Sequence, residues 1–262
     1  MKPLICLFTF LPALFAFNPT CAAELPAIVH YAQLVELGVP VSGVVGKVFV
    51  GDGQAITQGT LMLELDDTPF LAEVDEAEAS LKRLSAERDE ARKALDRNLE
   101  LYDRMVLSTV DLDTQKLQYV RAESQFQSAQ ARLSLAKYHF TNSKLHAPFD
   151  GVVLNTHAYP GMAVRVDLKP PVLFLYAKTG QFTAEADTTA DRLGGIAIGD
   201  TVEVQVGDSR YPGRISNITL ASEGRSTSQP SQYRVRALLD ATGKNIMPGQ
   251  PATLITRDGS KQ

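Results

Sequence analysis

The segment from Phe70 to Ala147 contains neither glycine nor proline. A run of this length without a helix breaker favours long helices. Apolar residues recur in it with the 3.5-residue period of a coiled-coil seam. Nine of the eleven seam positions in the first half are apolar, and eight of the nine in the second half. The positions are 70, 74, 77, 81, 84, 88, 91, 95, 98, 102 and 105, then 112, 115, 119, 122, 126, 129, 133, 136 and 140.

These two stripes predict an antiparallel helical hairpin over residues 68–146. Thr68 can cap the first helix, with Pro69 at its first helical position. Ser108 lies three residues before Asp111, which is the spacing of a capping box for the second helix. A first helix from Pro69 to Met105 would be roughly 55 Å long.

An internal repeat flanks the hairpin. Gly43-Val44-Val45 is followed after seven residues by Gly53, and Gly151-Val152-Val153 is followed after the same interval by Gly161. Glycine at matched points predicts turns with positive φ or close backbone approach, with valine-rich strands beside them. Because one half cannot bury a core alone, we expect residues 41–67 and 147–177 to pair into one small sandwich.

The remaining β segments predict a small antiparallel barrel over residues 178–262. Thr201–Val206 and Tyr233–Leu238 alternate as half-buried strands do, and glycine-containing turns separate such runs. Residues 24–40 are expected to add N-terminal strands to this barrel, including one at Leu34–Pro40.

The first 23 residues have the features of a signal peptide. Lys2 precedes an apolar run from Leu4 to Phe17, and small residues follow at Cys21-Ala22-Ala23. Cleavage there would give a mature chain from Glu24 without cysteine, located in the periplasm either in solution or in peripheral association with the inner membrane. An uncleaved membrane anchor is the alternative, although the run is short for a span of about 20 residues.

The order of half motif, hairpin, second half motif and barrel resembles the membrane fusion protein family, the HlyD-like periplasmic adaptors of tripartite RND-type efflux pumps. The matching segments are Val41–Val45, Val50–Gly53, Ala147–Val153 and Met247–Gln250. The resemblance implies a mainly β protein with a long antiparallel α-helical hairpin, a split lipoyl-like sandwich and a small antiparallel barrel. It also implies an RND-type inner-membrane transporter and a TolC-like outer-membrane channel as partners, with assembly as a homo-trimer or homo-hexamer. The family's membrane-proximal domain is expected to be absent or vestigial.

Arg97, Leu101 and Ser108 reproduce an Arg-x3-Leu-x6-Ser pattern that this family uses to dock on a TolC-like channel. Arg97 would offer a fork of donors, Leu101 an apolar knob and Ser108 a hydroxyl at the turn. Each residue also has a purely structural interpretation: a solvated helix charge, hairpin packing and an N-cap respectively.

Other chemistries find little support in the sequence. Lipoyl and biotinyl carriers present a lysine on the turn between the half motifs, but a hairpin replaces that turn and Lys144 lies at a helix exit. The four histidines show no ligand spacing, even His139 and His146, expected seven apart on the second helix. We therefore expect no enzyme, no metal and no cofactor, and the net charge of −4 disfavours nucleic acid. Two alternatives stay open: an adaptor of an ABC-type exporter or secretion system, and a structural coiled-coil protein of the envelope.

Overall fold

The computed structural model describes residues 23–167, 170–193, 195–222, 231–241 and 246–256. The expected signal peptide therefore lies almost entirely outside the described residues. The chain divides into two compact units, one from Gln33 to Thr179 and one that joins the N-terminal segment to the chain from Gly180 onward. Each unit has its own buried core.

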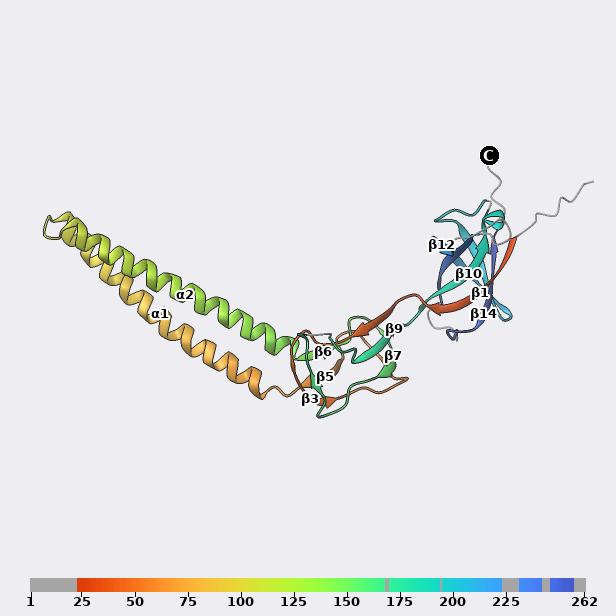
Figure 1. Ribbon diagram of the computed structural model, residues 1–262, viewed down its shortest axis with the longest axis horizontal. Helices are drawn as coiled ribbons and strands as arrows, with labels where there is room; N and C mark the ends of the chain where they lie inside the picture. Colours follow the sequence, from red (N-terminus) through yellow and green to blue (C-terminus); the bar gives the residue numbers. More distant parts are fainter. Residues whose placement is uncertain (1–22, 168–169, 194, 223–230, 242–245, 257–262) are drawn as a thin grey trace, which may run out of the picture. The chain divides into compact units, whose positions relative to one another are not determined.

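The first unit contains a β sandwich of two four-stranded sheets (Figure 1). One sheet has the order β2-β9-β7-β4 and the other β6-β5-β3-β8. The strand bounds are β2 Leu34–Leu37, β3 Gly43–Val48, β4 Ala55–Ile56, β5 Leu61–Leu65, β6 Lys144–His146, β7 Gly151–Thr156, β8 Ala163–Val164 and β9 Phe174–Lys178. Each sheet mixes strands from both half motifs, as the repeat predicts.

The two halves are related by an approximate two-fold symmetry of their hydrogen bonds. The amide of Val45 donates to the carbonyl of Met162 at 2.8 Å, and the equivalent amide of Val153 donates to Gln54 at 3.0 Å. The Gly53 amide donates to Val153 and the Gly161 amide to Val45, both at 2.8 Å. Neither half completes its hydrogen bonding without the other.

The repeated glycines have the two roles expected of them. Gly53 and Gly161 have φ values of 77° and 86°, in the left-handed region that glycine adopts without steric cost. Gly43 and Gly151 instead allow close approach. A Cβ at Gly151 would collide with the carbonyl of Ala177 and the ring of Tyr176.

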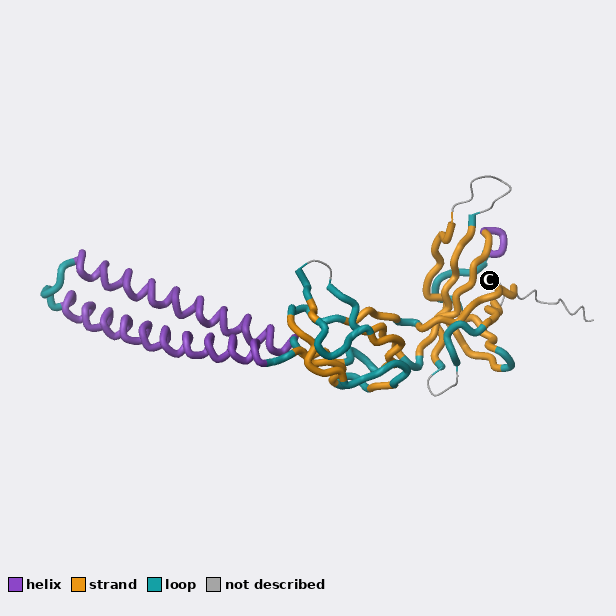
Figure 2. Tube along the Cα trace, turned by 60° about the horizontal axis from the view of Figure 1, so that its bottom comes forward, coloured by secondary structure: helices purple, strands orange, loops and turns teal. Residues whose placement is uncertain are grey.

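The hairpin consists of α1 (Thr68–Asp103) and α2 (Thr109–Asn142), which lie side by side along their length (Figure 2). Burial follows the expected seam, because the half-buried and buried residues of both helices recur at the seam positions. Phe70 and Phe140 at the base pack into the sandwich core, so the hairpin is anchored there. No described helix is long and apolar enough to cross a membrane.

The N-terminus of α1 and the C-terminus of α2 differ in detail from the expectation. The N-cap of α1 is Asp67 rather than Thr68, and Asp66 accepts hydrogen bonds from the amide and hydroxyl of Thr68 at 3.1 and 2.8 Å. These bonds hold the pKa of Asp66 below its ordinary value. At the other end α2 stops at Asn142, because the buried Ser143 accepts from the Leu65 amide and the chain then enters β6. Residues 144–146 thus belong to the sandwich, which corrects the hairpin boundary at residue 146.

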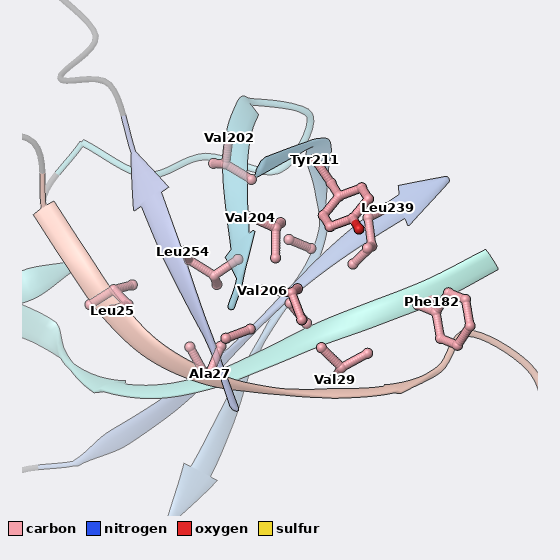
Figure 3. Close-up of a cluster of buried hydrophobic side chains, with 14 of the residues drawn as sticks. Leu25, Ala27, Val29, Phe182, Val202, Val204, Val206, Tyr211, Leu239 and Leu254 are labelled. Carbon is pink, nitrogen blue, oxygen red and sulfur yellow. The ribbon is translucent and has the colours of Figure 1, made fainter. Parts of the chain in front are cut away.

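The second unit is a closed six-stranded barrel with the order β1-β10-β13-β12-β11-β14. Alternate side chains point inward and form its core, as Figure 3 shows for Leu25, Val204 and Leu254. The bounds are β1 Ala23–Tyr31, β10 Gln181–Thr189, β11 Thr201–Val206, β12 Ser209–Ser222, β13 Gln232–Asp240 and β14 Pro251–Thr256, with a short 3-10 helix at Ala190–Arg192.

The expected barrel strand at Leu34–Pro40 is wrong. β2 pairs with β9 in the sandwich, from Leu34 opposite Ala177 to Leu37 opposite Phe174. The barrel is closed instead by the nine residues of β1, which bond to β10 on one side and β14 on the other. A four-residue strand carries no local signal for its partner, so the sequence pattern could not assign it.

Candidate partner-docking site at the hairpin tip

The turn between the helices has the hydrogen bonding of a Schellman motif. The Met105 amide donates to the Tyr102 carbonyl at 2.8 Å, and the Val106 amide donates to the Leu101 carbonyl at 3.0 Å. This pattern requires a left-handed residue after the C-cap Arg104, and Met105 has φ 60°. The turn is therefore short and fixed by the backbone.

Ser108 is the N-cap of α2, as predicted. Its hydroxyl oxygen accepts from the Asp111 amide at 3.2 Å and its hydroxyl group donates to Asp111 Oδ2 at 2.7 Å. The side chain of Ser108 is thus already engaged within the chain. Any bond to a partner would have to use the remaining lone pair of its oxygen.

Arg97 and Leu101 lie one turn apart on α1 and therefore share a face. The side chain of Arg97 is 63% exposed, and its guanidinium lies 3.7 Å from the exposed carboxylate of Glu90. An ion pair this exposed contributes little, so Arg97 is available to a partner. Leu101 is 40% exposed, which is high for a residue whose role would be hairpin packing alone.

Three further apolar residues at the tip were not singled out from the sequence. Met105 is 94% exposed, Val106 72% and Val110 73%. The seam pattern assigned Met105 to the helix interface, which is wrong because α1 ends at Asp103. The available signal was the Ser108 cap, since it requires a connecting loop directly before it.

Other candidate residues are placed away from any shared site. His139 lies on α2 with its Nδ1 3.2 Å from Glu73 Oε2, whereas His146 lies in β6 rather than on the helix. Lys144 also lies in β6, with its ammonium 5.1 Å from the centre of the Phe140 ring. Within the described ranges, no three histidine, cysteine or carboxylate side chains gather as a metal site would require.

The hairpin matches a known family model. Residues 73–143 match the RND MFP alpha-helical hairpin domain. Over 122 residues the chain is 30% identical to the multidrug resistance protein MdtA of Yersinia enterocolitica, which is 47% of this chain and 28% of that relative. The match spans between 25% and 65% of the length of the first curated relatives.

Solved structures share the fold across both units. The membrane fusion protein Spr0693 of Streptococcus pneumoniae R6 matches with a TM-score of 0.70 at 15% identity, over 92% of this chain and 100% of that one. A MacA–MexA chimera with the Pseudomonas aeruginosa MexA hairpin matches with a TM-score of 0.68 at 19% identity, over 92% and 83% of the two chains.

A split sandwich that carries a helical hairpin and continues into a closed barrel is the fold of membrane fusion proteins. The hairpin sequence points the same way, because it matches the RND branch of these proteins. Residues 73–143 thus match the hairpin domain of RND membrane fusion proteins, and both units share their fold with solved membrane fusion proteins.

Proposed function

We propose that this protein is a non-enzymatic periplasmic adaptor that links an inner-membrane efflux transporter, of RND type, to a TolC-like outer-membrane channel. In this proposal residues 1–23 direct export and are removed. Several copies stand side by side, as a trimer or hexamer, with their hairpin tips on the channel.

The observation that carries the proposal is the tip itself. Along the length of the hairpin, the seam side chains of α1 and α2 are half-buried or buried between the two helices. Near the tip, Arg97 and Leu101 are instead exposed on one face of α1, next to the turn that contains Ser108. A guanidinium and an apolar side chain on one rigid helical face suit a protein surface that offers carbonyl or carboxylate acceptors beside an apolar contact. The match of residues 73–143 to the RND MFP hairpin domain supports the same function.

The test is capture of a TolC-like channel from the same organism by the full-length mature protein. We expect Arg97→Asp combined with Leu101→Ser to reduce capture by roughly a hundredfold, because interface changes at charged and apolar anchors each typically cost more than tenfold. Circular dichroism should show unchanged helix content, since both side chains point to solvent.

A matched control makes the same two kinds of change away from the tip. Arg83→Asp combined with Leu71→Ser also alters an exposed arginine and an exposed leucine of α1. This variant should capture the channel like the wild type. Undiminished capture by the tip variant would argue against the docking site, and capture by neither wild type nor variant would favour a structural envelope protein.

A further inference from the structure

Met105 is the only residue other than glycine with positive φ in the described part of the chain. Its φ of 60° lies in the left-handed region, where the eight other positive values all belong to glycine. The Schellman turn needs this conformation, and glycine or asparagine adopts it at lower steric cost. Methionine is therefore a costly choice for the turn.

Packing within the chain does not explain this choice. Met105 is 94% exposed, so its side chain buries almost nothing against the hairpin. Such motifs often gain a contact between the residue after Met105 and the last helical turn, but here Val106 is 72% exposed. Val110 in the first turn of α2 adds a third exposed apolar side chain at the same end of the hairpin.

One exposed apolar residue on a protein surface is ordinary. Three at one rigid turn, one of them in a disfavoured backbone conformation, are not explained by the fold. The turn requires the left-handed backbone conformation but not a methionine in it, and backbone strain of this kind is a recognised mark of a functional position. We propose that Met105, Val106 and Val110 form an apolar knob that inserts into an apolar depression on the proposed channel; this inference rests on the proposed function.

The charges around the knob favour a protein over a membrane as its occupant. The tip segment, residues 100–113, carries the carboxylates of Glu100, Asp103, Asp111 and Asp113 and only one cation, Arg104, which leaves three negative charges. Anionic lipid headgroups would repel these carboxylates. An apolar depression with a basic or neutral polar rim complements them.

The experiment compares Met105→Gly with the wild type in the full-length mature protein. Glycine fits the left-handed position, so the midpoint of thermal unfolding should be equal to or higher than that of the wild type. The dissociation constant for the purified TolC-like channel, measured by biolayer interferometry, should nevertheless rise by roughly tenfold or more. A purely structural role for Met105 cannot produce this combination of opposite signs.

Two control variants sharpen the comparison. Met105→Leu keeps an apolar side chain at the same backbone position and should bind within about threefold of the wild type. Leu135→Ser removes an exposed apolar side chain near the C-terminal end of α2, away from the tip, and should bind like the wild type.

The possible failures are distinguishable. Equal binding of Met105→Gly and the wild type overturns the knob and leaves the docking proposal intact. Lost binding together with a lowered unfolding midpoint overturns it too, because Met105 would then be structural. Failure of the wild type to bind the channel overturns both proposals, and Met105-dependent binding to phosphatidylethanolamine–phosphatidylglycerol vesicles overturns the choice of a protein occupant.

Discussion

Gly151 lies where the backbone of the second half motif crosses the ring of Tyr176. The Tyr176 hydroxyl donates to the carbonyl of Phe149 at 2.8 Å, and the two rings stack with centres 5.2 Å apart. Burial raises the pKa of Tyr176, which keeps this hydroxyl protonated as a donor. The Asp150 carboxylate accepts a hydrogen bond from the backbone amide of Gln58 at 2.8 Å, which connects the segment before β7 to the first half motif. Ala147–Val153, one of the segments that carry the family resemblance, therefore acts as a structural lock between the two halves.

At this scale we predict that Gly151→Ala destabilises the protein by roughly 1–3 kcal/mol, because the added methyl group overpacks a buried site. Urea unfolding followed by tyrosine fluorescence would measure the change. Gly51→Ala is the matched control, since nothing lies within 4 Å of a Cβ there, and it should be neutral within about 0.5 kcal/mol. Equal effects of the two changes would refute the lock.

At the scale of elements, the hairpin holds a charge inside its seam. Arg88 occupies a seam position of α1, and its guanidinium lies over the ring of Phe126 of α2 with the carbon 4.1 Å from the ring centre. Asp89 accepts from the same guanidinium at 2.7 Å. Arg88 thus serves the hairpin through stacking rather than through burial in an apolar layer.

A double-mutant cycle tests this contact. Phe126→Ala should cost about 1–2 kcal/mol through the loss of half-buried ring surface. Adding Arg88→Ala should then lower the urea midpoint by less than Arg88→Ala does alone, because the contact is already lost. The cycle of Arg83→Ala with Phe126→Ala should be additive, and additivity in both cycles would exclude the Arg88–Phe126 interaction.

Elements with a strong local period could be predicted from the sequence. The heptad pattern of apolar residues predicted both helices of the hairpin. The strand Thr201–Val206 has the expected bounds, because the alternation of apolar and polar residues that predicts it lies within the strand itself. The partner of β2 and the end of α2 could not be predicted, since both depend on contacts with residues distant in the chain. No glycine or proline marks the exit at Ser143; its buried backbone bond to Leu65 does.

The candidate site shows the same division. The Ser108 cap follows from local spacing, and the structure confirms it. The docking roles of Arg97, Leu101 and Ser108 remain predictions. The exposure of Met105 could not be predicted, because an ideal heptad continues through it while the real helix ends two residues earlier.

At the scale of the whole molecule, each of the two units has a hydrophobic core of its own. The barrel also has a network of ion pairs between two neighbouring strands. Arg234 on β13 forms two hydrogen bonds to Asp187 on β10, at 2.9 and 3.2 Å, and also approaches Glu185 at 2.8 Å. Arg236 bonds to the other oxygen of Glu185 at 2.9 Å. Two adjacent barrel strands are thus joined by side chains as well as by backbone.

This network predicts an acid-dependent contribution to barrel stability. The hydrogen bond from Arg234 lowers the pKa of Asp187 below the value of about 3.9 for an unfolded aspartate. The contribution is therefore fully present above that pH and is lost as the pH falls through the lower folded pKa. The stability difference between the wild type and Asp187→Asn should be constant from about pH 7 to 5 and shrink below about pH 4.

Thermal unfolding across this pH range would measure the difference, which should be small because the groups are partly exposed. Asp208→Asn, a change in an exposed turn, controls for the loss of one negative charge. A difference that grows as the pH falls would contradict the assignment.

The sandwich sends the chain out after β5 and takes it back into β6, and these two strands are hydrogen-bonded neighbours in one sheet. The start of α1 and the end of α2 are therefore both held next to this strand pair, whatever the length of the hairpin. Removing one heptad from each helix would shorten the arm by about 10 Å and leave every strand pairing unchanged. The length of the hairpin thus depends only on the number of heptads in each helix. Matched insertions or deletions of heptads can change this length without altering the sandwich that carries the hairpin.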